Sequence, residues 1–274
     1  MTRRASWFRG ALAAAALATT SCAAPLMKLP SGSATLATDG AEVRRQASAT
    51  CRSIRTISAE VSVQGKVGGH RLRARLLAGL ASPASAYIEA PAPFGSPIFI
   101  FSARDDDATL LLPRDRRVLE RGRPADVLEA IAGVPLGPSD LREALTGCSA
   151  DPSASTVQAL GADWRMASGP TDLYWHRDRP MDPWRLVVVR HHDAGRPDWR
   201  AEYRDFMNDI PRTIRLISAD RRRFDLSLNL SQVEINVPLD AETFRIQIPP
   251  GTSPISLEEL RDSGPLAAPE KFDE

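Results

Sequence analysis

The chain has 274 residues, of which 43% are hydrophobic and 25% are charged, and its formal net charge is +1. A nucleic-acid-binding protein needs an excess of basic residues on one face, so this near-neutral balance argues against a nucleic-acid partner. The length suits one large β-rich domain or two small ones. Once both ends of the chain are set aside, it favours one domain.

The first 21 residues have the features of an export signal. Arg3, Arg4 and Arg9 precede a short apolar run at residues 11–21. A helix that crosses a bilayer needs about 20 predominantly apolar residues, which is longer than this run. Residues 1–21 are therefore predicted to be a signal peptide rather than a membrane-spanning helix.

The apolar run ends at Cys22, in the sequence ATTSCAA. This stretch resembles a bacterial lipobox, in which the cysteine is diacylated and becomes the mature N-terminus. Thr19 stands where leucine is usual, so ordinary cleavage after Ala23 or Ala24 is the alternative. Ala23 is not the aspartate that retains many lipoproteins at the inner membrane. The resemblance therefore implies a palmitate-bearing anchor on the periplasmic face of the outer membrane.

The composition at the two ends of the mature chain predicts little fixed structure. Residues 22–38 are rich in small residues, serine and proline, and they are predicted to be a flexible tether that follows the lipidated cysteine. Residues 265–274 are predicted to be a flexible tail. One folded domain is therefore expected at residues 39–264.

Two cysteines remain once Cys22 is acylated or removed. Cys51 and Cys148 form an even pair in an oxidising compartment, which favours a disulfide. Two buried, reduced cysteines are the alternative.

The domain is predicted to begin with a helix and continue as a sheet. One apolar stripe of the helix, at steps of four, four and three residues, consists of Val43, Ala47, Cys51 and Ile54. From Ile57 the apolar and polar residues alternate, which is typical of antiparallel strands with one apolar face. Further strands are predicted along residues 85–121 and 156–237.

Two short helices are predicted between the two runs of strands, at residues 124–133 and 138–147. Pro124 stands near the start of the first, and Gly133 and Gly147 end the two helices. A change of parity near Ser231 and Gln232 predicts a bulge in the last long strand.

These elements predict an α+β fold. A sheet of about ten or eleven antiparallel strands curls or closes, and its apolar face needs cover. The helices are the available cover. We therefore expect an unclosed antiparallel β half-barrel covered by a helical lid.

No constellation of catalytic or metal-binding residues emerges from the sequence. A G-x-S-x-G nucleophile motif is absent, and the histidines are scattered. His191 and His192 are adjacent on a predicted strand, so they point to opposite faces and cannot share a metal ion. We therefore expect neither an enzyme nor a metal or cofactor site.

The order of several stretches resembles the outer-membrane lipoprotein insertase family, LolB, and its periplasmic carrier relative, LolA. After the cysteine-anchored start come APFGSPIFIF at 92–101, ADVLEAIAGVPLGPSDLREALTG at 125–147 and EINVPLDAETFRIQIPPG at 234–251. The resemblance covers about residues 40–260. It implies an unclosed barrel with a helical lid, which holds lipoprotein acyl chains without catalysing a reaction.

The resemblance also implies a set of site residues. Acyl chains would be held by apolar residues of the strands and the lid, namely Val61, Val63, Leu72, Leu76, Leu128, Ile131, Leu141, Leu145, Leu226 and Leu228. Phe94 precedes Gly95 in the connection where the anchored member carries an apolar, membrane-contacting residue. The alternative is that the Phe94 ring folds back onto the sheet.

The expected function is therefore a monomeric outer-membrane lipoprotein that binds acyl chains. It would accept lipoproteins or lipids, with a LolA-like periplasmic carrier as a possible partner, and insert them into the outer membrane. The alternative is a structural or sensory lipoprotein whose barrel is filled by its own side chains and whose surface binds a protein or glycolipid.

Overall fold

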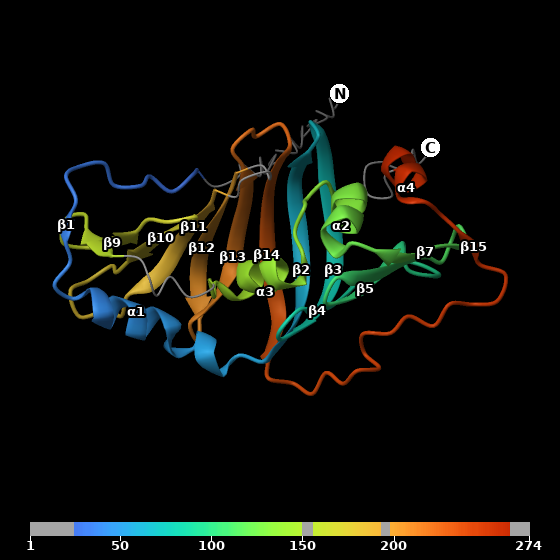
Figure 1. Ribbon diagram of the computed structural model, residues 1–274, viewed down its shortest axis with the longest axis horizontal. Coiled ribbons are helices and arrows are strands. Elements are labelled where there is room, and N and C mark those ends of the chain that lie inside the picture. Colours follow the sequence, from blue (N-terminus) through green and yellow to red (C-terminus); the bar gives the residue numbers. More distant parts are fainter. Residues whose placement is uncertain (1–24, 150–155, 193–197, 264–274) are drawn as a thin grey trace, which may run out of the picture.

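The computed structural model describes residues 25–149, 156–192 and 198–263 (Figure 1). The predicted signal peptide, the lipidation residue Cys22 and the predicted tail at 265–274 lie outside the described residues.

Within these described ranges, fifteen strands form one sheet in the order β1-β8-β9-β10-β11-β12-β13-β14-β2-β3-β4-β5-β6-β7-β15. The strands are β1 (Thr35–Leu36), β2 (Thr56–Val67), β3 (His70–Ala81), β4 (Ser85–Ala90), β5 (Phe99–Arg104), β6 (Asp107–Leu112), β7 (Arg117–Gly122), β8 (Val157–Ala159), β9 (Trp164–Ala167), β10 (Thr171–His176), β11 (Arg185–His191), β12 (Trp199–Met207), β13 (Ile210–Ser218), β14 (Phe224–Ile235) and β15 (Ser253–Pro254).

The sheet is antiparallel throughout, except that β15 runs parallel to β7. Strands β1 and β15 stand at opposite ends of the strand order, so the sheet does not close on itself. The prediction of an unclosed antiparallel sheet is confirmed.

The number of strands exceeds the expected ten or eleven, in part for two physical reasons. The segment predicted as one strand at 156–169 is divided into β8 and β9 by a turn, in which Gly161 has a φ of +75°. Strands β1 and β15 have two residues each, which is too short for any alternation of apolar and polar residues to be seen.

The two longest pairings lie at the middle of the sheet. Strands β2 and β3 have 12 residues each and are joined by Gly68 and Gly69, whose φ values of +56° and +83° suit glycine. On the other side, β14 pairs with β2, and the register shifts between Ser231 and Glu234. Gln232 there has a φ of +49°. The predicted bulge is confirmed.

The helices are α1 (Gly40–Ala49), α2 (Pro124–Ala132), α3 (Pro138–Thr146) and α4 (Leu257–Ser263), with a 3-10 turn η1 (Cys51–Ser53) after α1. The predicted first helix is therefore interrupted near Thr50. Helices α2 and α3 end at Gly133 and Gly147, which have φ values of +66° and +70° and confirm the predicted stops.

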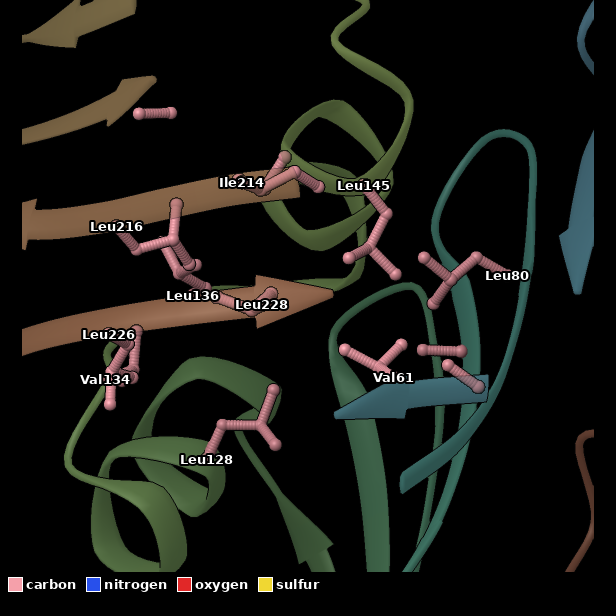
Figure 2. Packing of buried hydrophobic residues seen from close by; sticks show 14 of the residues in the cluster. Val61, Leu80, Leu128, Val134, Leu136, Leu145, Ile214, Leu216, Leu226 and Leu228 are labelled. Carbon is pink, nitrogen blue, oxygen red and sulfur yellow. The ribbon is translucent and has the colours of Figure 1, made fainter. Parts of the chain in front are cut away.

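Helices α2 and α3 lie over the middle of one face of the sheet, which we call the inner face (Figure 1). Helix α3 contacts β3, β4 and β13, and α1 contacts β8 and β11 towards the β1 end. Figure 2 shows how the space beneath α2 and α3 is filled. Leu128 of α2 and Leu145 of α3 face apolar side chains of β2, β3, β13 and β14.

The opposite face, the outer face, carries a second apolar cluster. It is formed by Tyr174, Val187 and Val188 of β10 and β11, and Met27 and Leu29 from the N-terminal segment pack against it. This docking differs from the flexible tether expected at residues 22–38. The composition suggested a linker, but the few apolar residues in it find an exposed apolar surface on the sheet.

Candidate functional site

The side chains predicted to hold acyl chains gather in one place, the centre of the inner face. Eight of them are buried in a single apolar cluster with exposures of 2–9%, namely Val61, Val63, Leu72, Leu128, Ile131, Leu145, Leu226 and Leu228. Leu76 and Leu141 are partly buried and pack against this cluster. Figure 2 shows five of the eight buried residues, Val61, Leu128, Leu145, Leu226 and Leu228, among the other buried side chains of this cluster.

A groove lies beside this core, between α1 and α3, and its volume is about 610 Å³. The floor is formed by Leu173 and Trp175 of β10 and Leu186 of β11, and Ala41 and Ala47 of α1 line one wall. This volume is within the range of about 300–1,000 Å³ that is typical of small-molecule sites. None of the predicted acyl-chain residues lines the groove.

Basic side chains line the same groove. Arg44 and Arg45 belong to α1, Arg52 to the 3-10 turn, and Arg142 to α3. Glu143 of α3 is the acidic residue in the lining. The groove therefore combines an apolar floor with a predominantly cationic lining, which is the arrangement that suits an amphiphilic ligand.

Sequence reasoning missed this groove, although a weak signal existed. Ala41, Arg44, Ser48 and Arg52 are spaced by three, four and four residues, so they share one side of the helical segment. This polar stripe lies next to the apolar stripe that was used to predict the helix. The partner wall from α3 is about 90 residues away in the chain, so nothing local indicated that the two would meet.

Cys51 and Cys148 line one end of the groove. The structure joins them in a disulfide with their Cα atoms 5.5 Å apart, across 97 residues of sequence. The bond connects the end of the α1 segment to the residue that follows Gly147 at the end of α3. It therefore fixes the distance between the two walls at this end of the groove.

A polar cluster lies between α3 and the sheet beside the groove. Nε2 of His191 lies 3.3 Å from Oε1 of Glu143, and the His191 ring stacks on Trp199 with centroids 4.0 Å apart. The hydroxyl of Tyr203 is buried without a hydrogen-bond partner among the described residues. Burial, followed by the Glu143 carboxylate, raises the pKa of Tyr203 well above its ordinary value, so the phenol stays neutral.

Phe94 lies in the connection between β4 and β5, and 89% of its surface is exposed. The ring is therefore not folded back onto the sheet. Backbone contacts hold this loop, because Arg114 donates hydrogen bonds to the carbonyls of Phe94 and Ser96 at 3.3 and 3.2 Å. Ile98 closes the loop by donating its N–H to the Ala90 carbonyl at 2.8 Å.

Within residues 25–149, 156–192 and 198–263, no group of three or more His, Cys, Asp or Glu side chains is placed to hold a metal ion. Over the same ranges, none of the helices has the length and apolar character needed to cross a bilayer.

Comparison with known proteins gives likenesses of structure and none of sequence. The chain matches no protein-family model, and no curated protein matches its sequence. A LolA superfamily protein from Nitrosomonas europaea superposes with a TM-score of 0.50 at 11% identity, covering 76% of this chain and 97% of that one. A domain named for outer-membrane lipoprotein sorting, from Vibrio parahaemolyticus, gives a TM-score of 0.47 at 14% identity, with coverages of 75% and 97%.

The first of these likenesses agrees with the unclosed antiparallel sheet. At 11% identity the likeness concerns the fold alone. The resemblance that the sequence suggested is confirmed at that level: this chain has the fold of a LolA superfamily protein.

Proposed function

We propose that this protein binds the acyl chains of a lipid or lipoprotein in the groove between α1 and α3, without catalysing a reaction. The observation that carries the proposal is the apolar floor of Leu173, Trp175 and Leu186, set in a groove on the inner face of a LolA-like half-barrel. Acyl chains need burial rather than chemistry, and a groove of this kind supplies burial.

The energetics of acyl-chain transfer support such a role. Each methylene removed from water contributes about 0.8 kcal/mol, so a chain of several methylenes binds an apolar groove with useful affinity. The bilayer interior offers the same stabilisation. A chain held in this groove would therefore be able to pass to a membrane without an energy source once the two are brought together.

In the finer form of the proposal, the protein is an outer-membrane lipoprotein on the periplasmic face. Cys22 would carry the lipid anchor, and Phe94 would enter the headgroup region of the membrane. The exposure of Phe94 and the pinned backbone of its loop support this role. A LolA-like periplasmic carrier would deliver the cargo, which the protein would insert into the outer membrane.

A second candidate function is a structural or sensory lipoprotein that binds a protein or glycolipid on its surface. The packed core beneath α2 and α3 favours it, because the residues predicted to hold acyl chains contact one another instead (Figure 2). In this case the groove would be a surface depression without a lipid ligand.

A matched pair of variants separates the two candidates. Ala41 and Ala49 are both exposed alanines of α1, but only Ala41 lines the groove. Binding of N-phenylnaphthylamine, a neutral apolar fluorophore, is measured for Ala41→Trp, Ala49→Trp and the unmodified protein, together with mass spectrometry of their organic extracts. Loss of the fluorophore and of co-purified lipid in Ala41→Trp alone supports the groove. If the unmodified protein carries no lipid and does not bind the fluorophore, the second candidate is favoured.

A further inference from the structure

Positively charged side chains outnumber negatively charged ones in the lining of the groove. An apolar floor alone would not need this excess of positive charge. Four arginines line the groove, whereas Glu143, whose Oε1 lies 3.3 Å from Nε2 of His191, is the acidic residue in its lining. A groove that held only an acyl chain would gain nothing from guanidinium groups, since each must remain hydrated or bonded to an acceptor.

The arginines differ in what they already bind. Arg45 forms an ion pair with Glu42 of its own helix. Arg52 donates to the hydroxyl of Ser48 at 2.9 Å, which is a neutral acceptor. The Nε atom of Arg142 is buried and has no hydrogen-bond partner among the described residues. Buried donors are nearly always paired in folded proteins, so this N–H is available to an acceptor that enters the groove.

Guanidinium groups restrict the chemistry of that acceptor. The planar fork of arginine donates two parallel hydrogen bonds to a phosphate or carboxylate, and it bonds such anions more strongly than neutral groups. The floor of Leu173, Trp175 and Leu186 accommodates an apolar chain beside that anion. The ligand that satisfies both surfaces is an amphiphile with one anionic head and one apolar chain.

We propose that the groove selects amphiphiles with an anionic headgroup, a phosphate ester above all, and that Arg52 and Arg142 bind the head while the chain lies on the floor. The inference rests on the proposed function, since it names the class of lipid for the same groove. It adds a specificity that burial of acyl chains does not supply.

The test compares two detergents with the same chain. Protein exported behind a cleavable secretory signal and carrying Cys22→Ser is titrated with dodecyl phosphate and with the neutral dodecyl maltoside, both kept monomeric. The protein is expected to bind dodecyl phosphate about tenfold more tightly, since charge-assisted hydrogen bonds contribute selectively to that complex. The preference should fall as salt is added.

Two charge-matched double variants test whether Arg52 and Arg142 cause the preference for dodecyl phosphate. Arg52→Gln/Arg142→Gln should remove the preference for dodecyl phosphate and leave the affinity for dodecyl maltoside unchanged. Arg71→Gln/Arg73→Gln alters two exposed arginines of β3 outside the groove and should keep the preference. An equal loss in both double variants would overturn the assignment, because it would reflect net charge alone.

The remaining outcomes separate this inference from the proposed function. Equal binding of both detergents would refute the headgroup preference while the acyl-chain groove stands. Binding of neither would refute both. In the last experiment, inorganic phosphate competes with dodecyl phosphate for the protein. If it displaces dodecyl phosphate fully at comparable concentrations, the groove is a site for a free anion, and the assignment to an amphiphile is overturned.

Discussion

Glu202 accepts the backbone N–H of Met27 with both carboxylate oxygens, at 3.1 and 3.0 Å, across 175 residues of sequence. The Glu202 side chain is fully buried and also pairs with Arg200 and Arg204 at 2.7 and 3.1 Å. The two arginines in turn donate to the carbonyls of Met27 and Pro25. The N-terminal segment is thus fastened to β12 by several polar contacts that share Glu202.

Glu202→Gln should loosen this segment and destabilise the domain. The substitution leaves two arginines, which are mostly buried, without their carboxylate, and breaking a buried ion pair costs about 3 kcal/mol. Urea denaturation measures the free energy of unfolding. Glu60→Gln is the control, because Glu60 pairs with Arg75, whose side chain is 66% exposed. That change should cost less than about 1 kcal/mol. Equal effects of the two variants would contradict the buried role of Glu202.

Cys51 and Cys148 are expected to be oxidised in protein purified from the periplasm. Their bond spans 97 residues, and closing a loop of that length stabilises the folded state by up to about 4–5 kcal/mol in the chain-entropy model. Cys51→Ser/Cys148→Ser should lower the midpoint of urea unfolding and weaken ligand binding in the groove. Mass analysis under non-reducing conditions gives the direct check, and two free thiols would rule the bond out.

Phe94→Glu should leave the fold and cargo binding intact but weaken delivery to membranes. The ring is 89% exposed, so replacing it should alter the free energy of unfolding by about 0.5 kcal/mol or less. At a membrane interface the change removes an apolar ring and introduces a charge that resists dehydration. Thermal melting, cargo retention and transfer to liposomes are measured together. Transfer that is unchanged in the variant would exclude the membrane contact.

Cys22→Ala should abolish membrane anchoring, because it removes the thiol that would be acylated. Fractionation of cells that express the two proteins shows whether the protein leaves the membrane pellet. An uncleaved signal could retain the variant there, so the control replaces residues 1–21 with a cleavable secretory signal. A control protein that carries Ala at position 22 and still sediments with outer membranes would refute lipid anchoring through this cysteine.

His192 should make stability depend on pH near neutrality. Hydrogen bonds from its ring to Asp198 at 3.0 Å and Asp172 at 3.2 Å raise its pKa above the ordinary 6.5. Because the folded state holds the proton more tightly, this stabilisation is fully present below pH 6.5 and is lost as pH rises through the raised pKa. Urea unfolding of the native protein should therefore give a larger decrease in stability from about pH 6 to pH 8 than His192→Gln gives. The same decrease in both proteins would contradict the role of His192.

The secondary structure was largely accessible from the sequence, because its signals are local. The alternation from Ile57 onward reports one buried face of a strand, and Gly133 and Gly147 can adopt the left-handed conformation that ends a helix. The bulge near Gln232 was visible as a change of parity. Two-residue strands such as β1 carry no periodicity, so the full extent of the sheet could not be predicted.

The candidate site was less accessible, and for different reasons. A leucine such as Leu128 or Leu226 is apolar whether it lines a ligand cavity or fills a core, so the pattern could not distinguish the two. The groove requires Arg52 and Arg142 to come together from distant segments. The docked segment depends on Met27 and Leu29, two apolar residues in a stretch whose composition is typical of a linker.

The fastening of Pro25 to Arg204 would also limit the reach of the lipid anchor proposed at Cys22. A free chain from residue 22 to residue 38 would let the domain move as far as about 55 Å from its lipid. With Pro25 held against β12, an acylated Cys22 can lie no farther than about 11 Å from it. The outer face of the sheet would then stay at the level of the lipid headgroups. A ligand held in the groove would then stay within a short distance of the membrane surface.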